Sequence, residues 1–174
     1  MEKFNHIELN NEVTKRGDNG FFRLEKDQEA IAEFLREVDY KTVKFSSEIK
    51  RLRYLVEENY YYNIFDKYIE DEIVECLELA ANYKFEFKSY MAASKFYKDY
   101  ALKTNDKKQY LENYNQHVFI VAMYLADGNV SLAKELMISM LEQRVQPATP
   151  TFLNSGRSRR GELVSCFLLE VGDS

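Results

Sequence analysis

Ser165 and Cys166 are the residues of this sequence whose types are best suited to chemistry. A thiolate is a nucleophile that can make or break a disulfide by exchange, and a neighbouring hydroxyl can hydrogen-bond a bound molecule and fix its position. On a strand the two side chains would point to opposite faces. A cysteine in a covered strand is more often a small core residue than a reactive one, so inert packing is the first interpretation of Cys166.

The residues before this pair offer groups that could bind an anion. Thr149–Gly156 contains hydroxyls, an amide and backbone donors, and loops of this kind can hold a phosphate. Most such loops only turn the chain, and the spacing of a Walker-type loop is absent. Arg157–Arg160 is a short basic run that, by itself, is typical of a solvated turn and too small for a nucleic-acid interface.

The element that must position Cys166 is a predicted strand over Glu162–Val171, where both alternating faces are largely apolar. Such a strand is usually covered on both sides, as in a parallel sheet or barrel. Pro147 and Pro150 disfavour helix at the residues that precede them, and Asn154–Gly156 predicts a turn. We therefore expect a loop that feeds a buried strand in residues 146–174.

The sequence before residue 146 predicts a helical domain over residues 1–145. Residues 1–26 are polar and turn-rich, with a turn at Gly17–Gly20. The clearest helix spans Tyr110–Ala126, with one apolar stripe, and Gly128 stands where a left-handed C-terminal residue belongs. Aromatic side chains at helical spacing favour core packing over base stacking. Further helices are expected near residues 27–35, 49–56, 71–81, 89–103 and 131–141.

Composition excludes several classes of protein. The 174 residues carry a net charge of −5, which argues against nucleic-acid binding through the overall field. The cysteines are Cys76 and Cys166 and the histidines His6 and His117, too few for a disulfide framework or a structural zinc site. Cys76 is expected to be buried and inert, and His117 has no second ligand nearby. No signal peptide or membrane-spanning run is present, so a cytoplasmic protein is expected.

The stretch Gln146–Ser174, with Gln-Pro-Ala-Thr-Pro-Thr-Phe-Leu-Asn-Ser-Gly-Arg and Arg-Gly-Glu-Leu-Val-Ser-Cys-Phe-Leu-Leu-Glu-Val-Gly-Asp-Ser, closely resembles the large (α) subunit of class Ib ribonucleotide reductase. Phe96–Asp106 and Ile7–Val13 resemble the same family. The resemblance covers essentially the whole chain but only the N-terminal portion of a family subunit several hundred residues long.

The resemblance implies a mainly α fold: the N-terminal helical domain of ribonucleotide reductase, then Glu162–Val171 as the first strand of an incomplete ten-stranded α/β barrel. The start of the helical domain resembles a shortened ATP-cone. Cys166 aligns with the N-terminal member of the redox-active cysteine pair, which becomes a disulfide as the ribose 2′-hydroxyl leaves. Thr149 and Ser165 align with substrate-binding positions, and Asp173 and Ser174 with positions that contact the nucleotide effector.

The activity implied for the complete enzyme is reduction of ribonucleoside diphosphates to deoxyribonucleoside diphosphates for DNA synthesis, by thiyl-radical and dithiol chemistry. The resemblance implies a radical supplied by a dimetal β subunit and an external dithiol of glutaredoxin or thioredoxin type. It also implies nucleotide effectors and an α homodimer that includes the remaining C-terminal part. No cofactor or metal bound by this chain, and no nucleic-acid or membrane partner, is expected.

The sequence lacks the cysteine that becomes the thiyl radical and the second member of the redox pair, so this portion is expected to be inactive alone. It could be a shortened form, the product of an interrupted gene or one part of a split subunit. An alternative is a stand-alone helical module that binds reductase subunits without catalysis. A nucleic-acid binder that uses Arg157–Arg160 is the third interpretation.

Overall fold

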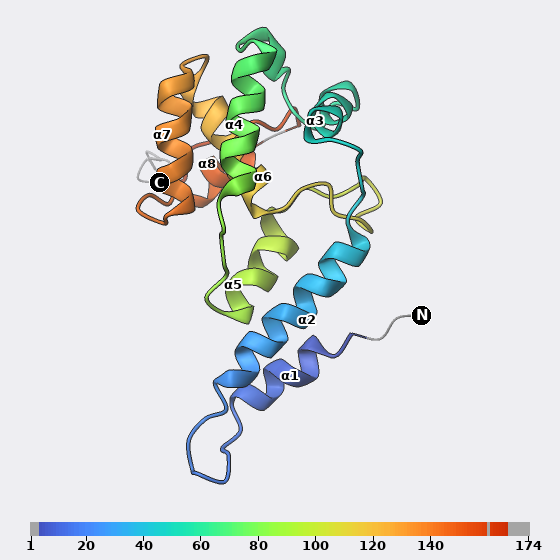
Figure 1. Cartoon of the computed structure of the whole chain (residues 1–174), viewed down its shortest axis with the longest axis vertical. Coiled ribbons are helices and arrows are strands. Elements are labelled where there is room, and N and C mark those ends of the chain that lie inside the picture. Colours follow the sequence, from blue (N-terminus) through green and yellow to red (C-terminus); the bar gives the residue numbers. More distant parts are fainter. Residues whose placement is uncertain (1–3, 160, 167–174) are drawn as a thin grey trace, which may run out of the picture. The chain divides into compact units, whose positions relative to one another are not determined.

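The computed structural model describes residues 4–159 and 161–166, and this part of the chain is mainly helical, as predicted (Figure 1). No strand is assigned within these ranges, where only isolated bridges pair extended residues. Among the same residues, no helix is long and apolar enough to cross a membrane. A 3₁₀ turn spans Ile64–Asp66 and a π turn spans Phe96–Tyr100; the α-helices are α1 (His6–Val13), α2 (Glu25–Lys41), α3 (Glu48–Glu57), α4 (Glu70–Asn82), α5 (Tyr90–Lys95), α6 (Tyr114–Ala126), α7 (Val130–Leu141) and α8 (Thr149–Asn154).

The chain forms two compact units, each discontinuous in sequence. The first contains residues 1–44 and 84–114, and the second contains residues 45–83 and 115–174. The boundary proposed between residues 145 and 146 stays a prediction.

In the first unit, α2 packs against both α1 and α5. The helix buries Ala30, Ile31 and Val38, which lie on one face at helical spacing. Aromatic rings also pack against one another in this unit, as core packing predicts: Phe34 of α2 meets Tyr97 edge to face with ring centroids 5.9 Å apart, and Phe85 stacks on Tyr114 with ring centroids 3.8 Å apart. These contacts bury apolar area that none of the short helices could bury alone.

The helix α1 corrects the expectation that residues 1–26 are only polar and turn-rich. It buries none of its residues, and Ile7, Leu9 and Val13 are its only large apolar residues, too few for periodicity to indicate a helix. Its position depends on contacts with α2 that are distant in the sequence. The turn expected at Gly17–Gly20 is present, because Gly20 has φ +79° and its N–H donates to the carbonyl of Gly17 at 2.9 Å.

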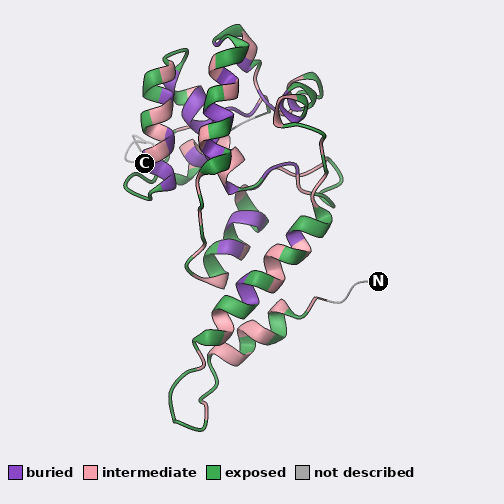
Figure 2. Cartoon of the chain, viewed as in Figure 1, coloured by how far each residue is buried: buried purple, intermediate pink, exposed green. Residues whose placement is uncertain are grey.

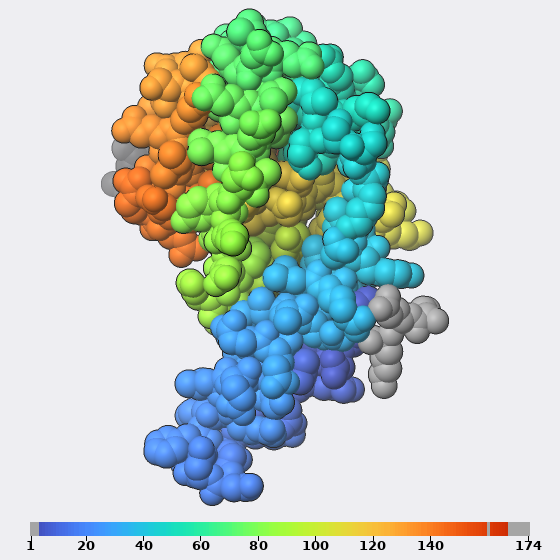
Figure 3. Space-filling view, in the orientation of Figure 1, coloured from blue at the N-terminus to red at the C-terminus, as the bar shows by residue number. Residues whose placement is uncertain are grey.

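The second unit is built around α6. Every residue from His117 to Met123 is fully buried, so the helix is covered on all sides instead of showing the single stripe that was expected (Figure 2). It also begins at Tyr114, four residues after the predicted start at Tyr110. In Figure 3, α4 lies on the surface of this unit with α7 on one side and α3 on the other. The hydroxyl of Tyr68 donates to the carbonyl of Met123 at 2.8 Å.

The junction between α6 and α7 follows the prediction. Gly128 adopts φ +95°, the left-handed conformation expected after the helix. The side chain of Asn129 then caps α7 by accepting a hydrogen bond from the N–H of Leu132 at 3.0 Å.

The region after residue 146 differs most from expectation. Thr149–Asn154 forms the helix α8 and not a loop, with Pro150 in the first turn. Proline is tolerated there because the first N–H groups of a helix have no intrahelical acceptor. The strand predicted over Glu162–Val171 is absent from its described part, residues 162–166, and residues 167–171 lie outside the described ranges. A strand needs a neighbour to bond its backbone groups, and the described residues provide none.

Candidate functional site

Ser165 and Cys166 are both exposed, and the hydroxyl of Ser165 donates toward the sulfur of Cys166 across 3.8 Å. The two side chains therefore contact each other and do not point to opposite faces, because the backbone here is not a strand. The interpretation of Cys166 as a core residue is wrong for the described structure, because its side chain is exposed. An exposed thiol with a hydroxyl beside it is accessible to another thiol or to a small molecule.

Two side chains of α8 hold the backbone that leads to this pair. The hydroxyl of Thr151 donates to the carbonyl of Leu163, and the amide nitrogen of Asn154 donates to the carbonyl of Glu162, each at 2.9 Å. Gly161 also approaches Asn154, since a Cβ added there would lie 3.4 Å from the amide nitrogen. The two side chains lie three residues apart, which places them on the same side of a helix.

The helix α8 is in turn fixed to α6 by His117. The Nε2 atom of His117 lies 2.8 Å from the carbonyl oxygen of Phe152, and the two rings meet edge to face with centroids 4.5 Å apart. A carbonyl can only accept, so Nε2 carries the proton. The Nδ1 atom then accepts from the Nη2 atom of Arg157 at 3.1 Å, since a guanidinium can only donate.

The turn after α8 is pinned at Gly156 and Arg157. Gly156 has φ +78°, and a Cβ there would lie 2.6 Å from Cγ1 of Ile120 on α6, so only glycine fits. Arg157 is buried, and its guanidinium lies 5.6 Å from the ring centroid of Tyr61. The expectation of a solvated basic turn is therefore wrong for Arg157, although Arg159 is exposed.

The other predicted site residues are placed only in part. Thr149 is exposed and is the first residue of α8. The same helix carries Thr151 and Asn154, which bond to the carbonyls of residues 163 and 162. Asp173 and Ser174 lie outside the described residues. Cys76 is buried on α4, and burial raises the pKa of its thiol to about 11, as expected for an inert cysteine. The described residues contain no cluster of metal-ligating side chains.

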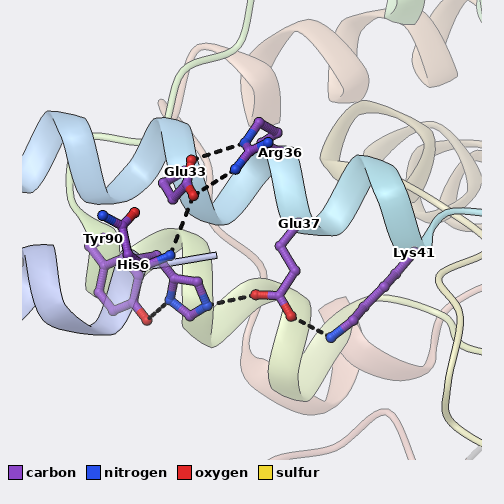
Figure 4. Close-up of polar contacts among 7 residues, drawn as sticks. His6, Glu33, Arg36, Glu37, Lys41 and Tyr90 are labelled. Carbon is purple, nitrogen blue, oxygen red and sulfur yellow. Dashed lines mark hydrogen bonds and ion pairs between the residues drawn. The ribbon is translucent and has the colours of Figure 1, made fainter. Parts of the chain in front are cut away.

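A polar cluster in the first unit was not predicted from the sequence (Figure 4). His6 on α1 lies 2.8 Å from the hydroxyl of Tyr90 through Nδ1 and 2.6 Å from a carboxylate oxygen of Glu37 through Nε2. Lys41 pairs with the other oxygen of Glu37. Burial raises the pKa of Glu37, but hydrogen bonds from Lys41 and His6 outweigh it, and the pKa lies below its usual value. The cluster ties α1 to α2 and α5.

Comparison with known proteins finds similarity to ribonucleotide reductases along nearly the whole chain. A family model described as ribonucleotide reductase N-terminal matches residues 6–85, and one described as ribonucleotide reductase, all-alpha domain, matches residues 86–160. Together the two models account for all the described helices.

Curated relatives carry the corresponding names. The ribonucleoside-diphosphate reductase NrdEB subunit alpha of Bacillus subtilis is 51% identical over 172 residues, which are 98% of this chain and 16% of that protein. A ribonucleoside-diphosphate reductase subunit alpha of the same organism is 50% identical over 170 residues, 97% of this chain and 24% of that protein. The subunit alpha of Mycoplasma pneumoniae is 42% identical over 171 residues, 97% and 23% respectively. The chain thus spans a quarter or less of the length of these relatives.

Proposed function

This chain belongs to the ribonucleotide reductase family, and from that premise we propose that it forms the N-terminal part of a class Ib α subunit that reduces ribonucleoside diphosphates. In this proposal residues 1–145 supply a helical scaffold, and residues 146–174 enter the catalytic barrel. Cys166 acts as one member of the redox-active pair, and the rest of the subunit contributes its partner.

The observation that carries the proposal is the contrast between the two cysteines. Cys166 is exposed beside a hydroxyl, whereas Cys76 is buried and its pKa is raised to about 11. A reductant must reach its substrate and exchange with an external dithiol afterwards, and Cys166 meets that requirement in the described residues. Cys76 does not, because thiol reactivity needs access and a thiolate.

The chemistry assigned to Cys166 balances with one further thiol. Two thiols together give up two electrons and two protons and become a disulfide. The substrate carbon that bore the 2′-hydroxyl is reduced, and this oxygen leaves as water. An external dithiol of glutaredoxin or thioredoxin type then reduces the disulfide by exchange, and a dimetal β subunit supplies the radical that starts the reaction.

The binding roles follow the same proposal. Thr149 and Ser165 hydrogen-bond the ribonucleoside diphosphate. Both side chains are exposed, and the hydrogen bonds from α8 to the carbonyls of Leu163 and Glu162 hold the segment that leads from one to the other. Asp173 and Ser174 contact a nucleotide effector near an α homodimer interface. In this proposal the enzyme works in the cytoplasm.

A chimera tests the proposal. This chain replaces the matching 170 residues of the Bacillus subtilis subunit alpha, which is 50% identical there. The chimera is mixed with the β subunit and a dithiol, and deoxynucleoside diphosphate is quantified, with the unaltered subunit as control. We expect turnover within about tenfold of the control, because an intact scaffold leaves the transition state unchanged.

The alternative, a helical module that binds reductase subunits without catalysis, predicts a different outcome. A chimera that binds the β subunit with normal affinity and forms no deoxynucleotide would support that alternative and contradict the proposal.

A further inference from the structure

The backbone before Cys166 is held by side chains of α8. Thr151 and Asn154 each donate one hydrogen bond, at 2.9 Å, to the adjacent carbonyls of Leu163 and Glu162. We name these two side chains the α8 clamp. Leu163 stands three residues before Cys166, and the same short segment is otherwise largely exposed, so packing against a core contributes little to its position.

The helix that carries the clamp is rigidly fixed. Phe152, between the two clamp residues, is buried, and its carbonyl accepts a hydrogen bond from the fully buried His117. The turn after α8 fits closely against Ile120 at Gly156. The clamp thus joins a well-packed part of the second unit to an exposed segment that bears the thiol.

We propose that Thr151 and Asn154 are positioning residues that set the location of Ser165 and Cys166 for substrate reduction. The expected effect on kcat rests on the proposed function. The expected effect on the position of residue 166 does not. Neither side chain touches the thiol in the structure; each acts through the backbone of residues 162 and 163.

A clamp of this kind affects the rate more than binding of substrate. Reacting atoms must approach within a narrow range of distance and direction, and a misplacement of about 1 Å can cost roughly 10²-fold in rate. Loss of the clamp therefore lowers kcat about 10-fold or more. KM changes less, because in this proposal Thr151 and Asn154 do not themselves contact the nucleotide.

The structural consequence is measured on this chain by a nitroxide spin label. The exposed Cys166 takes the label and the buried Cys76 does not, so the spectrum reports on residue 166. Thr151→Val and Asn154→Ala each remove one donor. We expect each to raise the ratio of mobile to immobile spectral component about fivefold, as one net hydrogen bond implies.

Two controls accompany these variants. Thr151→Ser keeps the hydroxyl and should retain the original spectrum, and Gln146→Ala removes an exposed amide outside α8. Labelling of Cys76 would reveal unfolding. Because His117 and Phe152 fix α8 independently of the clamp, we expect one label per chain in every variant. Unchanged spectra in both Thr151→Val and Asn154→Ala would overturn the inference.

The same substitutions in the chimera measure the catalytic consequence. A lower kcat with nearly unchanged KM, restored by Thr151→Ser, is the expected result. If the chimera is active and both Thr151→Val and Asn154→Ala keep a normal kcat, the positioning role is refuted, whereas the proposed function is not. If the chimera with the original Thr151 and Asn154 is inactive but the spin-label spectra respond as expected, the proposed function is refuted. The structural part of the inference, that these residues hold the backbone before Cys166, then still stands.

Discussion

His117 lies in the first turn of the helix α6, and its Nε2 atom is 2.8 Å from the carbonyl oxygen of Phe152 on α8. Both side chains are buried, and the second imidazole nitrogen accepts from Arg157 at 3.1 Å. One residue thus satisfies polar groups from α8 and from the turn that follows it. This arrangement fixes the helix that carries Thr149 and the residues holding the backbone before Cys166.

Replacing His117 by leucine should destabilise the protein by about 2–4 kcal/mol, because the buried carbonyl of Phe152 and one nitrogen of Arg157 each lose a hydrogen-bond partner. Urea denaturation followed by circular dichroism measures the free energy of unfolding. His117→Gln, which keeps a donor and an acceptor, should lose less. A leucine variant as stable as the original chain would show that the polar contacts contribute nothing.

Gly156→Ala should cost more stability than Gly128→Ala. Both glycines have positive φ, +78° and +95°, so both variants acquire backbone strain of about 1 kcal/mol. At Gly156 the new methyl would also lie 2.6 Å from Ile120, whereas at Gly128 the nearest atom is 3.4 Å away. Overpacking adds about 1–3 kcal/mol. Both positions lie in the second unit, so equal unfolding free energies would contradict the close contact.

Glu37→Gln should make the first unit less sensitive to acid. The pKa of Glu37 is lowered from 4.5 in the folded chain, because Lys41 and His6 stabilise the carboxylate more than burial disfavours it. Its stabilising contribution is therefore present above pH 4.5 and is lost as the pH falls through the folded pKa.

Thermal unfolding between pH 7 and pH 3 checks this pH dependence. The glutamine variant should be about 0.5–1 kcal/mol less stable at pH 7, and the difference should disappear in acid. Glu8→Gln, at an exposed position on α1, serves as control. A difference that persists unchanged at pH 3 would refute the role of the carboxylate charge.

The two cysteines should differ in alkylation. Iodoacetamide at pH 8 should modify Cys166 rapidly and leave Cys76 intact, because Cys76 is buried and its pKa is raised to about 11. Peptide mass spectrometry identifies the modified residue, and urea should expose both. Equal modification of both thiols without denaturant would contradict the contrast on which the proposed function rests.

Periodicity predicted the long helices because their apolar residues recur every three or four positions. The apolar stripe between Leu111 and Leu125 predicted α6, but it did not predict that His117 and Phe119, which lie off the stripe, are buried as well. A 3.6-residue pattern shows which face is apolar, and polar residues that find partners inside the protein are invisible to it. The helix α1 was missed for the opposite reason, since it buries no residue at all.

The residues that hold the candidate site were beyond sequence reasoning. Thr151 and Asn154 bond to main-chain carbonyls, and every residue carries such an acceptor, so no residue type marks the pairing. Pro150 was interpreted as a helix breaker, although proline also suits a first helical turn. Residue types alone singled out Ser165, Cys166 and the loop that contains Thr149, whereas the role expected of each residue came from the resemblance. Their substrate-binding and redox roles stay predictions.

A single-turnover experiment with Cys166→Ser tests the central claim most directly. The prereduced chimera and the β subunit are mixed with a ribonucleoside diphosphate without external dithiol, and deoxynucleotide and free thiols are counted. The original residue should give a burst of about one deoxynucleotide per active site with loss of two thiols, and Cys166→Ser should give none. An equal burst from the serine variant, with the same loss of thiols, would contradict the assignment of Cys166 as a reductant.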